Sequence, residues 1–154
     1  MFTAITHSQI YVLDQDEALD FYVGKLGLEV TADADLGFMR WLTVSIPGRP
    51  DRQILLETPD PPRLSAETAQ QVRELLAKGA MGGHLVFSTD DCRTTYATLR
   101  GRNVEFTEEP TERPYGIDCG LRDPFGNSIR FTQPKQPPSA PRSTTGNTGH
   151  EETA

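Results

Sequence analysis

The sequence predicts an α+β fold built from two βαβββ modules in a pseudo-twofold arrangement, with their sheets curled around a shared cavity. Three observations support this prediction. Residues 5–30 read as strand, helix and strand, and a second unit of the same kind begins near residue 84. The two units are offset by about 75 residues, which is too long for a solenoid repeat. We therefore expect one domain over residues 1–133, with modules at 4–58 and 82–133.

The first unit carries clear local signals. Ile10 and Val12 alternate with more polar neighbours, which is the period-two pattern of a half-buried strand. Asp14 is placed to cap the helix that follows, and Gly27 is placed to end it with a left-handed backbone. The same signals predict the remaining elements, which are a strand that starts at 28–30 and ends in a turn before residue 38, strands at 38–46 and 53–57, a linker helix at 65–78, a strand at 82–88, a helix at 92–102, a strand at 104–106, a loop at 108–114, and strands at 115–121 and 128–132.

Composition excludes several classes of partner. The chain has 154 residues and a formal charge of −7, which argues against nucleic acid or an anionic membrane surface as a partner. No apolar stretch approaches the roughly 20 residues of a membrane span, and the N-terminus lacks the pattern of a signal peptide. We expect a cytoplasmic protein.

Two further features have structural interpretations. Cys92 and Cys119 are too few and too far apart for a disulfide framework, and neither has a base beside it in sequence, so we interpret both as structural thiols. Residues 134–154 are rich in Pro, Ser, Thr and Gly, which predicts a flexible C-terminal tail.

The alternation also predicts which side chains face the cavity. His7, Gln9 and Tyr11 share the face opposite Ile10 and Val12 on the first strand. Aromatic side chains on such faces could form a flat apolar wall for an aromatic ligand, although core packing is an alternative role for Trp41. The candidate ligand-binding residues are Gln9, Tyr11, Met39, Trp41, Thr43, Ser88, Tyr115, Asp118 and Arg130.

Three motifs resemble those of a known superfamily. They are H-x-x-I-x-V-x-D from residue 7, F-Y-x-x-x-L-G from residue 21 and D-P-F-G-N from residue 123. The chain resembles the vicinal oxygen chelate superfamily, which includes glyoxalase I, extradiol dioxygenases, fosfomycin-inactivating transferases and bleomycin-resistance proteins. The resemblance covers residues 4–133 and implies the fold and a homodimer. It leaves the function open, because one scaffold serves several functions.

The resemblance also points to candidate metal ligands. Members that bind metal carry ligands on the first and last strand of each module, at positions that match His7, Glu57, His84 and Arg130 here. Arginine cannot ligate a metal, so we expect Arg130 to form an ion pair with Glu57 or to bind an anionic group of a ligand. His7, Glu57 and His84 could still hold Zn, Ni, Mn or Fe as a facial triad. Otherwise the two histidines line the cavity and no cofactor is expected.

Two functions compete on this evidence. The first is a protein similar to bleomycin-resistance members, which sequesters an aromatic or natural-product ligand without chemistry. The second is a metal-dependent lyase, isomerase or dioxygenase that uses His7, Glu57 and His84. A structural or regulatory module has no positive feature behind it. The arginine at position 130, where the lyases carry a catalytic carboxylate, favours the binding protein.

Overall fold

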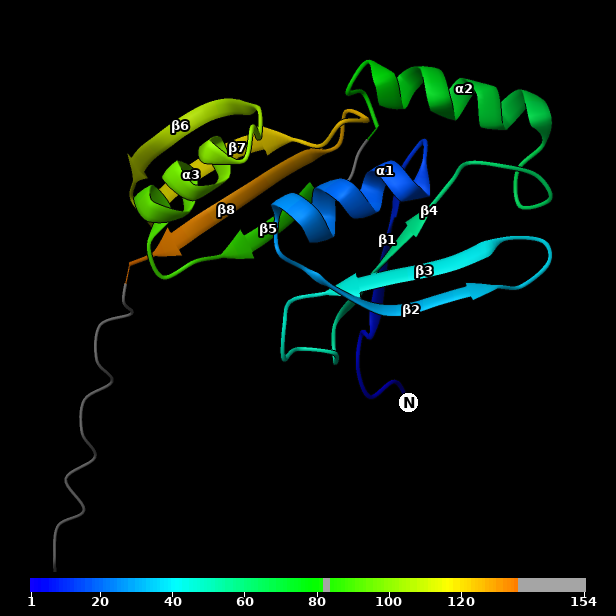
Figure 1. Cartoon of the computed structure of the whole chain (residues 1–154), viewed down its shortest axis with the longest axis horizontal. Helices are drawn as coiled ribbons and strands as arrows, with labels where there is room; N and C mark the ends of the chain where they lie inside the picture. Colours follow the sequence, from blue (N-terminus) through cyan, green and yellow to red (C-terminus); the bar gives the residue numbers. More distant parts are fainter. Residues whose placement is uncertain (82–83, 136–154) are drawn as a thin grey trace, which may run out of the picture.

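The chain folds into two repeated modules (Figure 1), and alternating apolar residues in their strands form the core. The computed structural model describes residues 1–81 and 84–135, with His84 described by its backbone alone. The first module comprises β1 (His7–Tyr11), α1 (Gln15–Leu19) with its π-helical continuation η1 (Asp20–Lys25), β2 (Glu29–Asp35), β3 (Arg40–Ser45) and β4 (Gln53–Glu57). Helix α2 (Ala66–Ala77) links it to β5 (His84–Ser88), α3 (Cys92–Gly101), β6 (Phe106–Arg113), β7 (Gly116–Arg122) and β8 (Ser128–Pro134). The predicted α+β fold with a duplicated βαβββ module is confirmed.

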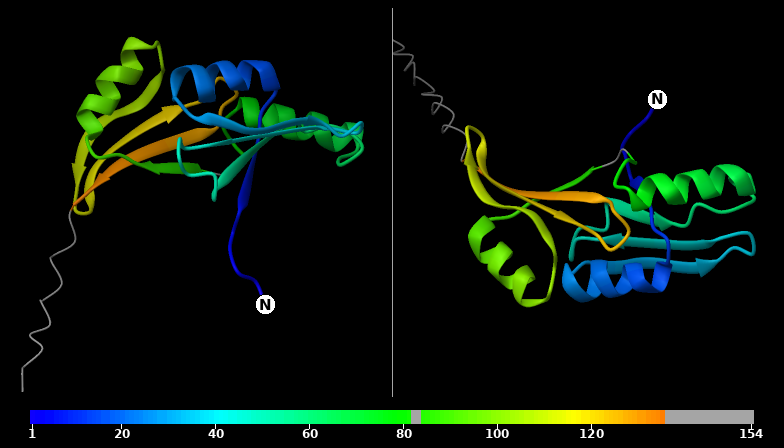
Figure 2. Two further views of the ribbon diagram at one scale, coloured as in Figure 1. Left: turned by 60° about the horizontal axis from the view of Figure 1, so that its bottom comes forward. Right: turned by 90° about the horizontal axis from the view of Figure 1, so that it is seen from above.

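Each module forms one four-stranded sheet. The strand orders are β1-β4-β3-β2 and β5-β8-β7-β6 in the part of the chain described. In both sheets the first and last strands of the module pair in parallel, and the other pairs are antiparallel. Two additional views show α1 and α3 on the same side of the two sheets (Figure 2).

Local signals in the sequence set the helix ends. The carboxylate of Asp14 accepts a hydrogen bond from the backbone N–H of Glu17 at 2.8 Å, and Asp91 does the same for Thr94 at 2.9 Å. Ser65 caps α2 in the same way. Gly27 has a φ of 78°, a conformation that strains residues with a Cβ, so a glycine is required where the first helix ends.

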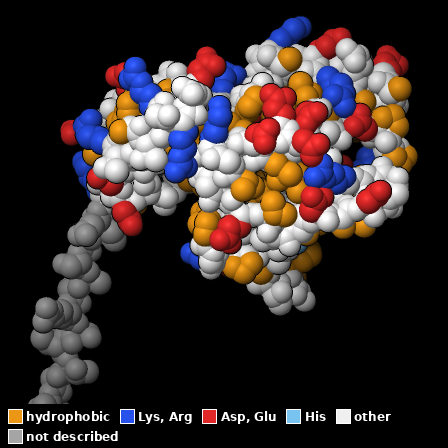
Figure 3. Space-filling view, in the orientation of Figure 1, with side chains coloured by type: hydrophobic (Ala, Val, Ile, Leu, Met, Phe, Trp, Pro, Cys, Tyr) orange, Lys and Arg blue, Asp and Glu red, His pale blue; other side chains and the backbone are white. Residues whose placement is uncertain are grey.

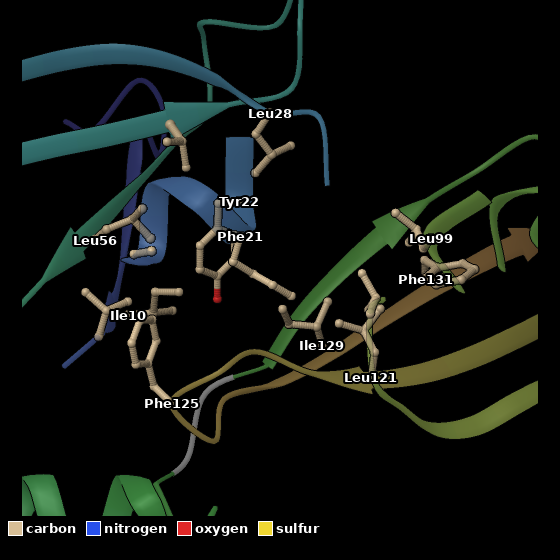
Figure 4. Close-up of a cluster of buried hydrophobic side chains, with 14 of the residues drawn as sticks. Ile10, Phe21, Tyr22, Leu28, Leu56, Leu99, Leu121, Phe125, Ile129 and Phe131 are labelled. Carbon is tan, nitrogen blue, oxygen red and sulfur yellow. The ribbon is translucent and has the colours of Figure 1, made fainter. Parts of the chain in front are cut away.

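One hydrophobic core joins the two modules. The helix-facing side chains of both sheets meet in it, and Figure 4 shows members of the first module, Ile10, Tyr22 and Leu56, in one cluster with Leu121, Phe125 and Ile129 of the second.

Two polar contacts cross the same junction. The hydroxyl of Tyr22 donates to Asp123 at 2.7 Å, and the side-chain amide of Asn127 donates to the backbone carbonyl of Tyr11 at 2.7 Å. Burial and the adjacent Asp123 carboxylate raise the pKa of Tyr22, so its hydroxyl keeps its proton and acts as a donor. The D-P-F-G-N turn therefore fastens one module to the other.

One predicted loop is a strand. Residues 108–114 are predicted to be a loop, but β6 runs from Phe106 to Arg113. Strand β6 lies at the edge of its sheet, and its register shifts around Pro110, between Glu108 and Thr111. An edge strand with a bulge tolerates a proline, because the missing N–H is not needed by a neighbour.

Charge is unevenly distributed on the helix-covered face. In Figure 3 acidic side chains gather over α1 and the β2–β3 hairpin, and Arg40 pairs there with Asp16 and Asp33 at 2.7 and 2.8 Å. None of the helices described is long and apolar enough to cross a membrane. Apart from Pro134 and Lys135, the predicted C-terminal tail lies outside the described residues.

Candidate functional site

The candidate residues of the first module lie on the sheet face that α1 does not cover. Ile10 and Val12 are buried in the core, whereas His7 and Gln9 are exposed and Tyr11 is half-buried. The rings of His7 and Trp41 approach with centroids 5.8 Å apart and an interplanar angle of 60°. A hollow of about 600 Å³ lies beside His7 and is lined by residues 3–8 and 51–53. Its volume falls in the range of small-molecule sites, roughly 300–1,000 Å³.

Two predicted ligand-binding residues of this module, Thr43 and Met39, do not lie exposed on this sheet face. Thr43 is 0% exposed, and its hydroxyl bonds to Thr31 at 2.7 Å and to the Gln53 side chain at 2.9 Å. Thr43 therefore links neighbouring strands through side-chain hydrogen bonds and does not present its hydroxyl to a ligand. Met39 is half-buried in the turn between β2 and β3.

The second module carries a connected polar cluster on β6, β7 and β8. Arg130 donates from Nε to Asp118 Oδ2 at 3.1 Å and from Nη2 to Glu108 Oε2 at 2.8 Å, and Nη2 also bonds to Asp118 Oδ1. Tyr115 donates to Asp118 Oδ2 at 2.8 Å, and Arg113 bonds to Glu108 Oε1. These five residues, named the Arg130 cluster, are Glu108, Arg113, Tyr115, Asp118 and Arg130.

The electrostatics of the Arg130 cluster favour ionised carboxylates. Hydrogen bonds from Arg130 hold the pKa of Asp118 below its usual range, and Arg130 is also the main cause of the lowered pKa of Glu108. Sequence reasoning identified Arg130, Asp118 and Tyr115 but missed Glu108 and Arg113. The missed pair stands in the segment that was expected to be a loop, where Pro110 obscured the strand pattern.

The structure brings the candidates together in two groups, one for each module. Among the residues described, no hydrogen bond, ion pair or ring contact joins the His7–Trp41 face to the Arg130 cluster. A cavity of about 210 Å³ between the modules is lined by residues of both, and Ser88 alone of the predicted ligand-binding residues lines it.

The predicted ion pair between Glu57 and Arg130 is wrong within this chain. Glu57 instead pairs with Arg63 at 3.0 Å, and Arg130 belongs to the cluster of Asp118 and Glu108. The Glu57 side chain is 6% exposed, and burial raises its pKa, while Arg63 counteracts the shift. Glu57 is thus paired with an arginine of the segment between the modules, and Arg130 with carboxylates of its own module.

The strand register explains the error. His7 lies opposite Gln53 on β4, and His84 lies opposite Ser128 on β8. Counted from these pairs, Arg130 corresponds to Leu55 in the first module. Glu57 corresponds instead to Thr132. Glu57 and Arg130 are therefore not equivalent positions of the repeat.

The same register tests the proposed metal ligands. Glu57 is four residues beyond Gln53, the partner of His7, so these two positions are about 13 Å apart along the strands at 3.3 Å per residue. Donors bound to one ion lie about 2 Å from it and so within about 4 Å of each other. The backbone positions of His7 and Glu57 are thus far apart on the sheet, and the side chain of His84 lies outside the described residues, so the metal triad stays a prediction. No group of three or more His, Cys, Asp or Glu able to hold a metal occurs in residues 1–81 and 84–135.

Both cysteines are buried. Burial raises the pKa of Cys119 to about 12 and also raises that of Cys92, so both thiols are protonated at neutral pH. A protonated, buried thiol is a poor nucleophile, which fits the interpretation as structural residues.

Replacing Glu57 with glutamine is expected to leave the free energy of unfolding at pH 7 unchanged or higher by up to about 1 kcal/mol. The substitution loses an ion pair but removes a charge from a buried position. Because the pKa of Glu57 is raised in the folded state, the wild type loses stability as pH rises through that pKa, so the relative stability of the variant should grow from pH 4 to pH 7. Urea unfolding at the two pH values measures this.

Asp60→Asn is the matched control for this prediction. Asp60 pairs with Arg73 at 2.6 Å, but its pKa is lowered, so the neutral amide should become less favourable with rising pH. A loss of more than about 1 kcal/mol in Glu57→Gln would show that the ion pair with Arg63 outweighs the cost of burying the charge.

The fold, the duplicated modules and the sequence motifs define a family. The sequence profile of the Glyoxalase/Bleomycin resistance protein/Dioxygenase superfamily matches residues 4–131, and the chain belongs to this family. The resemblance inferred from the motifs is thus confirmed.

Individual relatives extend this result. The chain is 32% identical over 130 residues to YurT, an uncharacterized protein of Bacillus subtilis strain 168, covering 84% of this chain and 98% of YurT. Among solved structures it is similar to UcmS2, with 39% identity, a TM-score of 0.81, and coverage of 86% of this chain and 99% of UcmS2. It is also similar to TnmS3, an antibiotic binding protein from Streptomyces sp. CB03234, with 29% identity, a TM-score of 0.69, and coverage of 87% and 98%.

Proposed function

We propose that this chain is a cytoplasmic binding protein that sequesters a small aromatic ligand, such as an antibiotic or a related natural product, without changing it chemically. The observation that carries the proposal is the ring pair of His7 and Trp41 on an open sheet face beside a hollow of ligand size. Aromatic rings on such a face bind flat apolar ligands by stacking and burial of surface.

Two further observations support binding rather than catalysis. Arginine 130 stands where glyoxalase-type lyases carry a carboxylate, and its guanidinium cannot serve as a base near neutral pH. It is also committed to Asp118 and Glu108. The similarity to TnmS3, described as an antibiotic binding protein, points in the same direction.

The proposal includes a homodimer. Met1, Phe2 and Ile5 form an N-terminal segment whose apolar side chains are almost fully exposed in the single chain. Apolar residues gathered on a surface commonly mark an interaction site, so a second copy of the chain is a suitable partner for this segment. The protein is therefore expected to sediment at twice the mass of the chain.

Isothermal titration calorimetry with bleomycin and a set of polycyclic aromatic antibiotics tests the proposal. At least one compound is expected to bind in excess chelator and to be recovered with unchanged mass. Trp41→Leu should weaken this binding about tenfold, because it removes the larger ring of the pair, while Trp41→Phe should retain much of the affinity. Turnover of the compound, or absence of binding across the set, would overturn the proposal.

A further inference from the structure

The side chain of Arg130 spans two neighbouring strands. Arg130 on β8 lies opposite Gly120 on β7, and Gly120 lies opposite Glu108 on β6. Nη2 of Arg130 reaches Glu108 Oε2 at 2.8 Å. Because adjacent strands are about 4.8 Å apart, a side chain that joins the outer two must pass above the middle one. Arg130 therefore crosses the sheet directly over Gly120.

Gly120 makes this path possible. A Cβ at position 120 would stand 3.2 Å from Nη1 of Arg130 and 2.9 Å from Oγ1 of Thr107. Gly120 is not among the glycines with a positive φ, so its backbone conformation does not demand a glycine. The missing side chain instead leaves space in which the guanidinium rests on the sheet.

The Nε–Nη2 edge of this guanidinium is already used, whereas no hydrogen bond from Nη1 occurs among the described residues. Nε and Nη2 donate to Asp118 and Glu108, which also accept from Tyr115 and Arg113, respectively. Two arginines thus balance two carboxylates. The Arg130 side chain is nonetheless 32% exposed and Tyr115 is 55% exposed. A ligand can therefore contact the planar surface of the Arg130 guanidinium and the phenol ring of Tyr115.

The buried charge of the first module is balanced in the same way. Glu57, at the end of β4, is paired with Arg63. A carboxylate ligand entering either module would find Arg63, or Nε and Nη2 of Arg130, paired already, and would meet Glu57, Asp118 or Glu108 as a like charge. Like charges in a partly desolvated site strongly disfavour binding.

We propose that the Arg130 cluster selects an uncharged, planar aromatic ligand, which stacks on the exposed surface of the Arg130 guanidinium above Gly120. This inference rests on the proposed binding function and names its ligand class. A planar guanidinium stacks on aromatic faces, an interaction that a lysine ammonium cannot reproduce. Arg130 is therefore a specificity residue, and its role does not require the anionic ligand group considered from the sequence.

The test compares two probes of equal ring size, naphthalene-2-carboxamide and 2-naphthoate, by isothermal titration calorimetry. Wild-type protein is expected to bind the carboxamide at least about tenfold more tightly than the naphthoate. Arg130→Lys, which keeps the charge but loses the plane, and Gly120→Ala, which displaces the guanidinium, should each weaken carboxamide binding about three- to tenfold. Arg73→Lys alters an arginine of α2 that pairs with Asp60, and it should leave the binding of the carboxamide unchanged.

The outcomes separate this inference from the function on which it rests. Equal or tighter binding of the naphthoate, or unchanged carboxamide binding in both variants, would overturn the inference while leaving a ligand-binding protein. Failure of the wild type to bind either naphthalene would also overturn the inference, whereas the binding function is overturned only if no compound of the antibiotic set binds or a bound compound is turned over. Circular dichroism confirms that each variant is folded, and the preference between probes in the wild type needs no variant.

Discussion

Asp123→Ala is expected to lower the free energy of unfolding by about 3–4 kcal/mol. The buried Asp123 carboxylate accepts from the backbone N–H groups of Phe125, Gly126 and Asn127 at 2.8–2.9 Å. It also accepts from Asn127 Nδ2 and from the hydroxyl of Tyr22, each at 2.7 Å. Alanine would leave the N–H groups of Phe125 and Asn127 and the hydroxyl of Tyr22 without this acceptor inside the core that joins the modules. Urea unfolding followed by circular dichroism measures the loss.

Tyr22→Phe is the control for this prediction. It removes one of the bonds to Asp123 but leaves the turn intact, so the expected loss is about 1 kcal/mol. Both variants should retain a single unfolding transition, because one core spans the two modules. An Asp123→Ala loss no larger than that of Tyr22→Phe would show that the turn does not depend on its carboxylate.

Arg130→Ala is expected to lower the free energy of unfolding at pH 7 by about 2–3 kcal/mol. Most of this loss comes from Asp118, whose side chain is only 5% exposed and would keep Tyr115 as its remaining partner. The estimate is below that for a fully buried pair because the Arg130 side chain is 32% exposed. Arg130→Lys should lose less, since it keeps a positive charge in place.

The loss should depend on pH in a defined direction. Arg130 lowers the folded-state pKa of Asp118 and Glu108, so the stability they contribute is complete above the unfolded pKa values of about 4. It disappears as pH falls through the lowered folded-state values. The difference between wild type and Arg130→Ala should therefore shrink from pH 7 to pH 3 in urea titrations. A difference of equal size at both values would mean that the effect is one of packing.

Much of the fold follows from short-range patterns in the sequence. Asp14, Ser65 and Asp91 cap the helices because their side chains can bond to nearby N–H groups, and Gly27 ends a helix because it accepts a left-handed backbone. Strand β6 was missed because a proline usually ends a strand, and its tolerance here depends on the strand lying at a sheet edge. Edge position is a property of the assembled sheet.

The candidate site shows a second limit of sequence patterns. Alternation with a period of two identifies the face of a strand, but a shift by two residues keeps every side chain on the same face. Glu57 and Arg130 were accordingly assigned to matching positions, whereas the register matches Arg130 with Leu55. The partners of Arg130 depended on the long-range pairing of β6 with β7, which no local pattern reveals.

The match of Leu55 with Arg130 has an evolutionary consequence. A duplicated unit begins with two identical halves, and each half can then change without altering the other. One half carries the buried Leu55 at this position and presents the ring pair of His7 and Trp41, and the other carries the charged Arg130 cluster. A scaffold with symmetric backbones and unlike halves can distinguish the two ends of an asymmetric molecule, which identical halves cannot do.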